Sequence, residues 1–499
     1  MNYYDLLQNN KLSQFLNRYW VVLFLILYIP VSYFLYGHAK LFDDNYIYLQ
    51  YAKHFVENKE LSFNLGEKSY AFTSPVWMIL CIILYPLISY ELIPVLLSLL
   101  FSLLTILLCW YLLKDALKNN LILPLAIIFI AFEPNFLRHT YNGFETSLTY
   151  LLSYLIILGI IHTGKIRNGY YIGAIFGLFM LVRPESIIFS FLTLLYLLVS
   201  RKINIKGIIR AAVSGIIIVL PWVIFTFLYF GKILPDTFGA KGGDYHSGLN
   251  LTHNLLNSAF IIGGNYFPIF ILMALNFKKI PDYLSGNKLK YSFMILVIAV
   301  YIFFYSIVLS NELIYARYLC IIFPVFITLS ILFIDFSIPT VRKSAICFSI
   351  VILIFLGTAF TISRLDKKLA DSGHTTENEI IGWVNKNTNK DNYISRIRIG
   401  EIGFKTQRRI FDPVGLINRD IAGYYQSGKI IDYYFIKKPD YLIDPPIYIV
   451  EALKKRCNIN VVKEFKIKIR LLVRQAILNY TDRNNTLKIY KIDWNLQTK

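Results

Sequence analysis

Long apolar runs separated by short polar stretches recur along the chain as far as residue 362. A helix needs about 20 apolar residues to cross a bilayer, so these runs predict membrane-spanning helices. The predicted helices lie near residues 20–36, 94–113, 121–132, 144–163, 170–182, 187–200, 211–230, 255–277, 291–310, 318–336 and 344–362. If each of them crosses, the chain passes through the membrane eleven times.

Basic residues in the connecting loops predict the orientation of these helices. Five clusters occur: Lys114 with Lys118, Lys165 with Arg167, residues 201–210, residues 278–290, and Arg342 with Lys343. Because cytoplasmic loops of membrane proteins carry an excess of Lys and Arg, all five clusters and the N-terminus are predicted on the cytoplasmic side.

The apolar run at 75–89 does not fit this orientation as a crossing helix, since one more crossing would move every later basic cluster to the outside. We therefore interpret it as a re-entrant or interfacial segment. In the alternative, 75–89 crosses and the short run at 121–132 does not, which leaves the later topology unchanged.

The character of the chain changes after residue 362. Residues 363–499 carry 26 Lys+Arg and 15 Asp+Glu, and no apolar run there is long enough to cross a membrane. Alternating residues at 464–471 predict a half-buried strand, 482–485 a turn, and 487–492 a second strand, while 377–385 predicts a helix. The chain thus divides into a membrane module, 1–362, with residues 38–74 as its first outer loop, and an extracytoplasmic α/β or α+β domain, 363–499.

Composition agrees with a polytopic membrane protein: 56% of residues are hydrophobic and the mean hydropathy is +0.52. The net charge of +20 arises from short loops and the C-terminal part, where orientation and contact with membrane lipid explain it, so we discount nucleic acid as a partner. The five cysteines show no metal-ligand spacing and predict neither a disulfide framework nor a zinc site.

Two adjacent acids, Asp43 and Asp44, follow the first predicted helix. Such a pair at the mouth of a helical bundle can take the proton of a hydroxyl or hold a divalent cation beside a phosphate, and each acid raises the pKa of its neighbour. The alternative is a solvated cap on an amphipathic helix at 45–58. The residues leave open which acid would be the base.

Further charged residues lie on the predicted outer side. Arg183 and Glu185 interrupt an apolar stretch, which makes them functional candidates or a structural ion pair. Lys241 and Arg317 supply two more cations, and three cations suit a phosphate, although each could also anchor a lipid headgroup. Glu145 lies at a predicted helix N-terminus, where capping of the dipole is the alternative role.

Short motifs follow one another along the chain: DDNYI at 43–47, FNLGE at 63–67, TSPVW at 73–77, GFET at 143–146, RPE at 183–185, GKILPDTF at 231–238 with AK at 240–241, ARY at 316–318, IGEIG at 399–403 and FDPVGL at 411–416. Taken in this order, they resemble the GT-C superfamily of polytopic glycosyltransferases. The resemblance is strongest to the branch that contains cell-wall arabinofuranosyltransferases using polyprenyl-phosphate arabinose.

This resemblance implies a GT-C type fold and an inverting transfer of a sugar, with arabinofuranose or another pentose as the best candidate. The donor would be a polyprenyl-monophosphate sugar, and the acceptor a hydroxyl of a cell-envelope glycan, lipid or protein outside the cytoplasmic membrane. Asp43 or Asp44 would act as the base, and the outer domain would be a candidate for acceptor binding. The implied phosphate-binding residues are Arg183, Lys241 and Arg317, and the supporting residues are Glu145, Glu185, Tyr46, Trp77, Glu401 and Asp412.

The chain departs from the pattern at two points. Glu401 stands where the branch usually has an aspartate, and the second acid pair of oligosaccharyltransferases is missing, which argues against a metal-dependent oligosaccharide transfer. No metal site is predicted and no cofactor is assigned, although a divalent cation stays open.

Two other classes compete with this interpretation. A lipid-linked sugar transporter or flippase would need buried ionisable residues near the midplane and paired halves, whereas here the charges gather on one side and no repeat is visible. A non-catalytic envelope assembly protein would keep the fold and tolerate loss of the acids.

Overall fold

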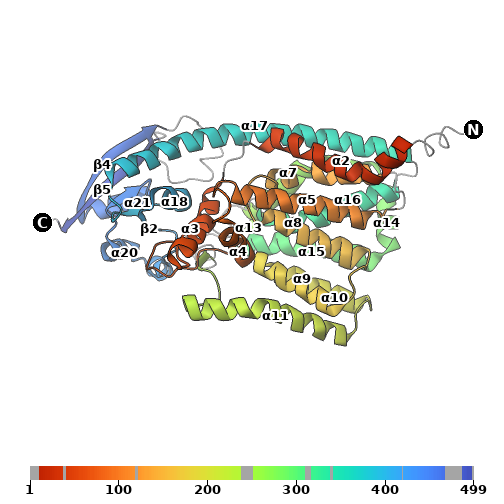
Figure 1. Ribbon diagram of the computed structural model, residues 1–499, viewed down its shortest axis with the longest axis horizontal. Helices are drawn as coiled ribbons and strands as arrows, with labels where there is room; N and C mark the ends of the chain where they lie inside the picture. The colour runs from red at the N-terminus through yellow and green to blue at the C-terminus, as the bar shows by residue number, and fades with distance from the viewer. Residues whose placement is uncertain are drawn as a thin grey trace, which may run out of the picture.

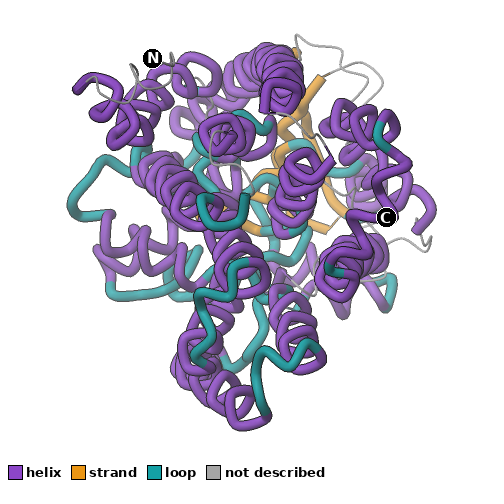
Figure 2. Tube along the Cα trace, turned by 90° about the vertical axis from the view of Figure 1, so that its right-hand side faces the viewer, coloured by secondary structure: helices purple, strands orange, loops and turns teal. Residues whose placement is uncertain are grey.

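The computed structural model describes residues 11–37, 41–117, 122–237, 251–308, 316–337, 341–418, 420–466 and 486–496. In this part of the chain, long helices run side by side and a smaller sheet-containing domain lies at one end of the bundle (Figure 1). Figure 2 looks along the helices, with the sheet on the far side.

Six of the described helices are long and apolar enough to cross a membrane. They are α2 (Lys11–Tyr36), α5 (Ile93–Leu113), α11 (Ile205–Phe230), α13 (Leu251–Leu275), α15 (Lys288–Val308) and α17 (Val341–Asn387). The predicted class, a polytopic helical membrane protein, is confirmed, whereas the number of crossings stays a prediction.

Shorter helices connect these and pack against them. They are α4 (Pro75–Leu84), α6 (Leu123–Ala131), α7 (Pro134–His139), α8 (Thr146–Tyr154) continued by the π-helix η2 (Leu155–His162), α9 (Gly169–Val182), α10 (Ser186–Val199), η3 (Phe277–Lys279), α14 (Ile280–Gly286), η4 (Tyr318–Ile321) and α16 (Phe323–Ser337). With 10 and 9 residues, α4 and α6 are both short for a bilayer. Helix length therefore does not decide between the two topologies.

Glycines bring α9 and α11 into close contact. A Cβ at Gly173 would overlap the carbonyl oxygen of Ala211, and one at Gly169 would overlap that of Gly207. Because small residues let helix backbones approach closely within a membrane, this pair packs without intervening side chains. Both helices run along one edge of the bundle in Figure 1.

The domain after residue 362, named the outer domain after its predicted location, is built on a five-stranded sheet in the order β2-β1-β3-β5-β4. Strand β1 pairs in parallel with β2 and β3, whereas β5 is antiparallel to β3 and β4. The strands are β1 (Tyr393–Ser395), β2 (Arg409–Phe411), β3 (Tyr441–Ile443), β4 (Cys457–Lys466) and β5 (Thr486–Leu496); the helices are α18 (Gly400–Thr406), α19 (Ile421–Gln426), α20 (Ile430–Lys437) and α21 (Ile447–Lys454).

The predicted strands are found where the structure describes them, at 464–466 and 487–492. The rest of the first strand, 467–471, and the predicted turn at 482–485 lie outside the described residues. A sheet with helices confirms the predicted mixed domain.

Helix α17 joins the membrane part to this domain. Its 47 residues correspond to about 70 Å, and Figure 1 shows it running from the bundle to the sheet. The prediction ended a helix at 362 and started another at 377, which was wrong. The apolar pattern does end there, but the polar residues that follow continue the same helix into the outer domain.

Candidate active site

The acid pair begins helix α3 (Asp43–Asn58), directly after the membrane helix α2. Phe42, the residue before it, is extended, with φ −77° and ψ 160°. Carboxylates in a first turn are stabilised by the positive end of the helix dipole, which agrees with a helix starting here. The two neighbouring carboxylates have different partners.

The Asp43 carboxylate caps α18 of the outer domain. The Gly400 N–H donates to its Oδ2 (3.0 Å) and the Glu401 N–H donates to its Oδ1 (2.9 Å). Gly400 has no room for a side chain, since a Cβ would overlap the carbonyl oxygen of Asp43. Burial raises the pKa of Asp43, against the opposing effects of Arg398 and the two N–H groups. Asp43 therefore attaches the first outer loop to the outer domain.

The Asp44 carboxylate instead faces Arg317. Its Oδ2 lies 2.6 Å from Arg317 Nη1, and the two side chains are 44% and 28% exposed. The Arg317 guanidinium also lies over the rings of Phe144 (5.5 Å) and Tyr318 (5.3 Å). Of the two acids, Asp44 thus keeps a solvent-accessible carboxylate beside a fixed cation.

Arg183 forms a buried ionic network. It pairs with Glu145 (3.3 Å) and Glu185 (3.2 Å), and Nη2 donates to the carbonyl oxygen of Arg317 (3.2 Å). The Tyr305 hydroxyl donates to Glu185 (2.6 Å). This arrangement fits the structural alternative for Arg183 and Glu185. In addition, the hydrogen bond from Arg183 to the Arg317 carbonyl oxygen holds the backbone that carries Arg317.

A polar chain beneath α3 was not identified from the sequence. The Asn45 side chain donates to the carbonyl oxygen of Asn142 (2.9 Å), and the Asn142 side chain contacts His139 Nδ1. Gly143 (φ +77°) packs against Asn45 and leaves no room there for a side chain. Burial and neighbouring arginines lower the pKa of His139 to about 3, so its imidazole is neutral. The only sequence signal was the Asn-Gly turn at 142–143.

Tyr46 and Glu401 meet where α3 packs on α18. The Tyr46 ring lies 5.7 Å from the Phe404 ring, and the almost fully buried Glu401 pairs with Lys405 (2.7 Å). The Lys405 ammonium lies over the Tyr46 ring (5.3 Å). Both predicted supporting residues thus lie in the contact between the two parts, next to the Asp43 cap.

The other predicted residues have separate surroundings. Trp77 is fully buried, with its ring 6.2 Å from that of Phe101. Asp412 accepts from the backbone N–H groups of Val414 (2.7 Å) and Ile417 (3.1 Å), which holds the loop after β2, and burial raises its pKa to about 6. Lys241 lies outside the described residues.

The outer loop makes a second attachment to the sheet. The Asn64 side chain donates to the carbonyl oxygen of Ile410 (2.8 Å) and accepts from its N–H (2.9 Å), and the Arg409 Nε donates to Glu67 (2.9 Å). Residues 63–67, a weak turn signal in the sequence, therefore pair with strand β2. The first outer loop is therefore attached to the outer domain at two points, Asp43 and Asn64.

Both acids have polar partners within the protein. The Asp43 carboxylate accepts hydrogen bonds from two backbone N–H groups, and the Asp44 carboxylate pairs with Arg317. Within the residues that the structure describes, no three His, Cys, Asp or Glu side chains come together as metal ligands.

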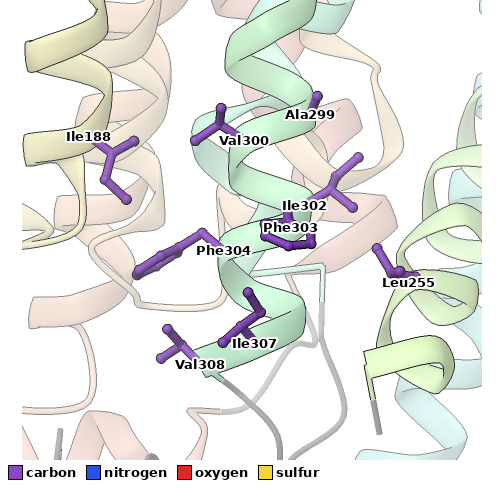
Figure 3. Close-up of a pocket in the computed structure, with 9 residues that line it drawn as sticks. All are labelled: Ile188, Leu255, Ala299, Val300, Ile302, Phe303, Phe304, Ile307 and Val308. Carbon is purple, nitrogen blue, oxygen red and sulfur yellow. The ribbon is translucent and has the colours of Figure 1, made fainter. Parts of the chain in front are cut away.

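An apolar groove of about 840 Å³ lies between α10, α13 and α15 (Figure 3). Ile188 of α10, Leu255 of α13 and Phe304 of α15 are among the residues that line it. Ile188 follows Glu185 by one helical turn, and Phe304 precedes Tyr305, whose hydroxyl binds Glu185. The groove thus adjoins the ionic network.

Comparison with known proteins gives two partial family matches. Residues 73–225 match the family described as dolichyl-phosphate-mannose-protein mannosyltransferase. Residues 367–490 match a domain of unknown function (DUF8728). No curated protein matches the chain.

Two solved structures are similar over nearly the whole length. Both are of ArnT from Cupriavidus metallidurans, one bound to undecaprenyl phosphate (TM-score 0.62) and one in the apo state (TM-score 0.58). Each is 12% identical to this chain, and each match covers 94% of this chain and 97% of ArnT.

Proposed function

We infer that this chain, which has the fold of the GT-C superfamily of membrane glycosyltransferases, transfers a sugar from a polyprenyl-phosphate donor to an acceptor hydroxyl. The superfamily resemblance seen in the sequence is confirmed by the mannosyltransferase family match and the ArnT-like fold. The observation that carries the proposal is the Asp44–Arg317 pair, an accessible carboxylate beside a cation at the outer end of the bundle.

Asp44 is the proposed general base. It would take the proton of the acceptor hydroxyl while the hydroxyl oxygen attacks the anomeric carbon. The bond from that carbon to the phosphate oxygen breaks, polyprenyl phosphate leaves with the electron pair, and the anomeric configuration inverts. Asp43 is less suited to this role because both of its oxygens already accept N–H bonds from α18.

Arg317 is the proposed contact to the donor phosphate. Its guanidinium is partly exposed, and a fixed cation stabilises the charge that develops on the leaving phosphate. Arg183 would not contact the phosphate directly. It would support Arg317 through its hydrogen bond to the Arg317 carbonyl oxygen, and Glu145 and Glu185 would hold Arg183 in place. Lys241 is proposed as a second phosphate ligand on the strength of the motif alone.

The apolar groove beside Glu185 is the proposed seat of the donor's isoprenoid tail. Its volume lies in the range of small-molecule sites, and its lining is apolar. The undecaprenyl phosphate bound to ArnT supports a donor of this chemistry.

We further propose that the protein lies in the cytoplasmic membrane, with its N-terminus in the cytoplasm and the acid pair and residues 363–499 outside. The basic loop clusters support this orientation. Arabinofuranose or another pentose is the proposed sugar on the basis of the motifs. In the part of the chain that the structure describes, no specific observation favours a transporter or an assembly protein.

The test is to incubate the purified protein in detergent with a panel of polyprenyl-phosphate sugars, arabinofuranose first, and to measure released polyprenyl phosphate with and without glycan, lipid and peptide acceptors. We expect Asp44→Asn to reduce release at least about 100-fold, because it removes the base. Wild-type turnover by Asp44→Asn would reject the assignment of the base. No release by the folded wild-type protein from any donor would favour the transporter or assembly classes.

A further inference from the structure

Phe42, the residue directly before the acid pair, is a large apolar side chain in an otherwise polar site. It is 46% exposed, whereas the aromatic residues that follow on the inner face of α3, among them Tyr46, are buried. Phe42 lies outside the regular helix, as the extended residue directly before α3. Exposed apolar side chains are common in this chain, and Phe42 is distinguished from them by its place directly before the acid pair.

The Phe42 ring packs against a second aromatic ring. It stacks on Phe144, with 5.4 Å between ring centroids and an interplanar angle of 28°. Phe144 is itself buried and lies against the Arg317 guanidinium, the partner of Asp44. A supported ring is a low-entropy contact surface, because its side chain is already held in place.

We propose that Phe42, supported by Phe144, is a stacking platform for a sugar ring of the acceptor, so that the acceptor is a glycan rather than a peptide or a plain lipid hydroxyl. This inference rests on the proposed glycosyl transfer. One face of a sugar ring carries mainly C–H groups, and laying that face on an aromatic ring buries apolar surface while the hydroxyl groups at the ring edge stay available. A hydroxyl of a sugar on Phe42 would lie close to the carboxylate of Asp44, two residues along the chain.

The charges favour the acceptor over the donor as the occupant. The donor phosphate requires cations, and the proposed one, Arg317, lies on Phe144 and pairs with Asp44. Phe42 adds no charge, and it reaches Arg317 only through the Phe144 ring. The acceptor sugar is the reactant that needs a neutral surface next to the base.

The direct test is saturation-transfer NMR with two named probes, methyl α-arabinofuranoside and methyl α-mannopyranoside. The proteins are the wild type, Phe42→Ala, Phe42→Leu and Phe42→Trp, with Phe55→Ala as the matched control because Phe55 is a second exposed aromatic residue (38%), within the helix that Phe42 precedes. Melting temperatures establish that each variant is folded, and Phe42→Leu keeps most of the apolar volume without the ring.

We expect the wild type, Phe42→Trp and Phe55→Ala to bind a probe, and Phe42→Ala and Phe42→Leu to bind it about tenfold more weakly, the loss of one stacking contact. Asp44→Asn is expected to bind the probe while losing turnover. Equal binding by Phe42→Ala and the wild type would overturn the platform.

Kinetics separate this inference from the proposed function. Once a reacting donor is found, Phe42→Leu should raise KM for the glycan acceptor about tenfold, with little change in kcat or in KM for the donor. A rise confined to the donor KM would overturn the acceptor assignment, even with glycosyl transfer established. Phe42-dependent probe binding by a protein that releases polyprenyl phosphate from no donor would support the sugar platform and reject the proposed reaction.

Discussion

At the scale of single residues, the two acids at the start of α3 differ in what surrounds them. Asp43 is enclosed by backbone donors from the outer domain, and Asp44 is open beside Arg317. Adjacent residues on a helix point about 100° apart, so a pair of identical side chains can serve two tasks. Asp43 attaches the loop to the outer domain, and Asp44 is the proposed base.

The Asp43 cap can be tested through the glycine that it contacts. Gly400→Ala places a methyl group against the Asp43 carbonyl oxygen, so α18 must shift away from the acid pair. We expect a fall in turnover of at least about tenfold and a loss of stability of about 1–3 kcal/mol from overpacking. Release of polyprenyl phosphate measures the effect on turnover, and the melting temperature measures the effect on stability.

Gly423→Ala is the matched control. Gly423 lies in α19 with nothing near the position of a Cβ, so this change should leave turnover unaltered and stability equal or slightly higher. If Gly400→Ala behaved like Gly423→Ala, the cap would not position the acid.

The motifs indicated candidate site residues, but they could not indicate which partners these residues have. Arg183 was expected to hold a phosphate, yet its guanidinium is used by Glu145, Glu185 and the Arg317 carbonyl. Such partners come from different helices, and no spacing along the chain encodes them. The sequence likewise did not indicate a role for Phe42, because that role depends on its contacts with Phe144 and, through Phe144, with Arg317.

At the scale of elements, the apolar runs predicted most helices within a few residues. The pattern could not show that α17 continues past 362, since polar residues form a helix in water as readily as a loop. It also missed the closeness of α9 and α11, which depends on glycines facing one another across two helices.

That helix pair supplies a prediction of its own. Gly173→Ala directs a methyl group at the Ala211 carbonyl oxygen and should force α9 and α11 apart, at a cost of about 1–3 kcal/mol. The melting temperature in detergent should fall accordingly. Gly264→Ala in α13, where a Cβ would meet nothing, is the control and should leave it unchanged or raised. Equal melting temperatures for the two variants would show that this packing adds no stability.

At the scale of the whole molecule, the first outer loop belongs to both parts. It leaves the membrane at α2, carries the acid pair, and binds the outer domain through Asp43 and Asn64. Helix α17 forms a second, continuous connection (Figure 1). Because the acid pair is held by the outer domain, movement of that domain would move the reacting groups.

The proposed orientation predicts which parts of the surface a reagent can reach from outside. A cysteine introduced at Lys429 in the outer domain should react with a membrane-impermeant maleimide on intact cells, whereas one at Lys206 should react only after permeabilisation. Both lysines are exposed, and the native cysteines are buried or half-buried, so the protein without an added cysteine is the control. The reverse pattern would place the acid pair in the cytoplasm.

The sequence by itself determined the class of the protein, the order of its motifs and the chemistry available to it. A helix that crosses a membrane requires a continuous run of apolar residues, which the sequence shows directly. The types of reactive side chain can also be read from the sequence. Tertiary structure decided which acid is accessible, which cation faces it, and that the outer domain binds Asp43. Those properties depend on contacts such as that between Asp43 and Glu401, 358 residues apart, and only the folded chain brings such positions within hydrogen-bonding distance.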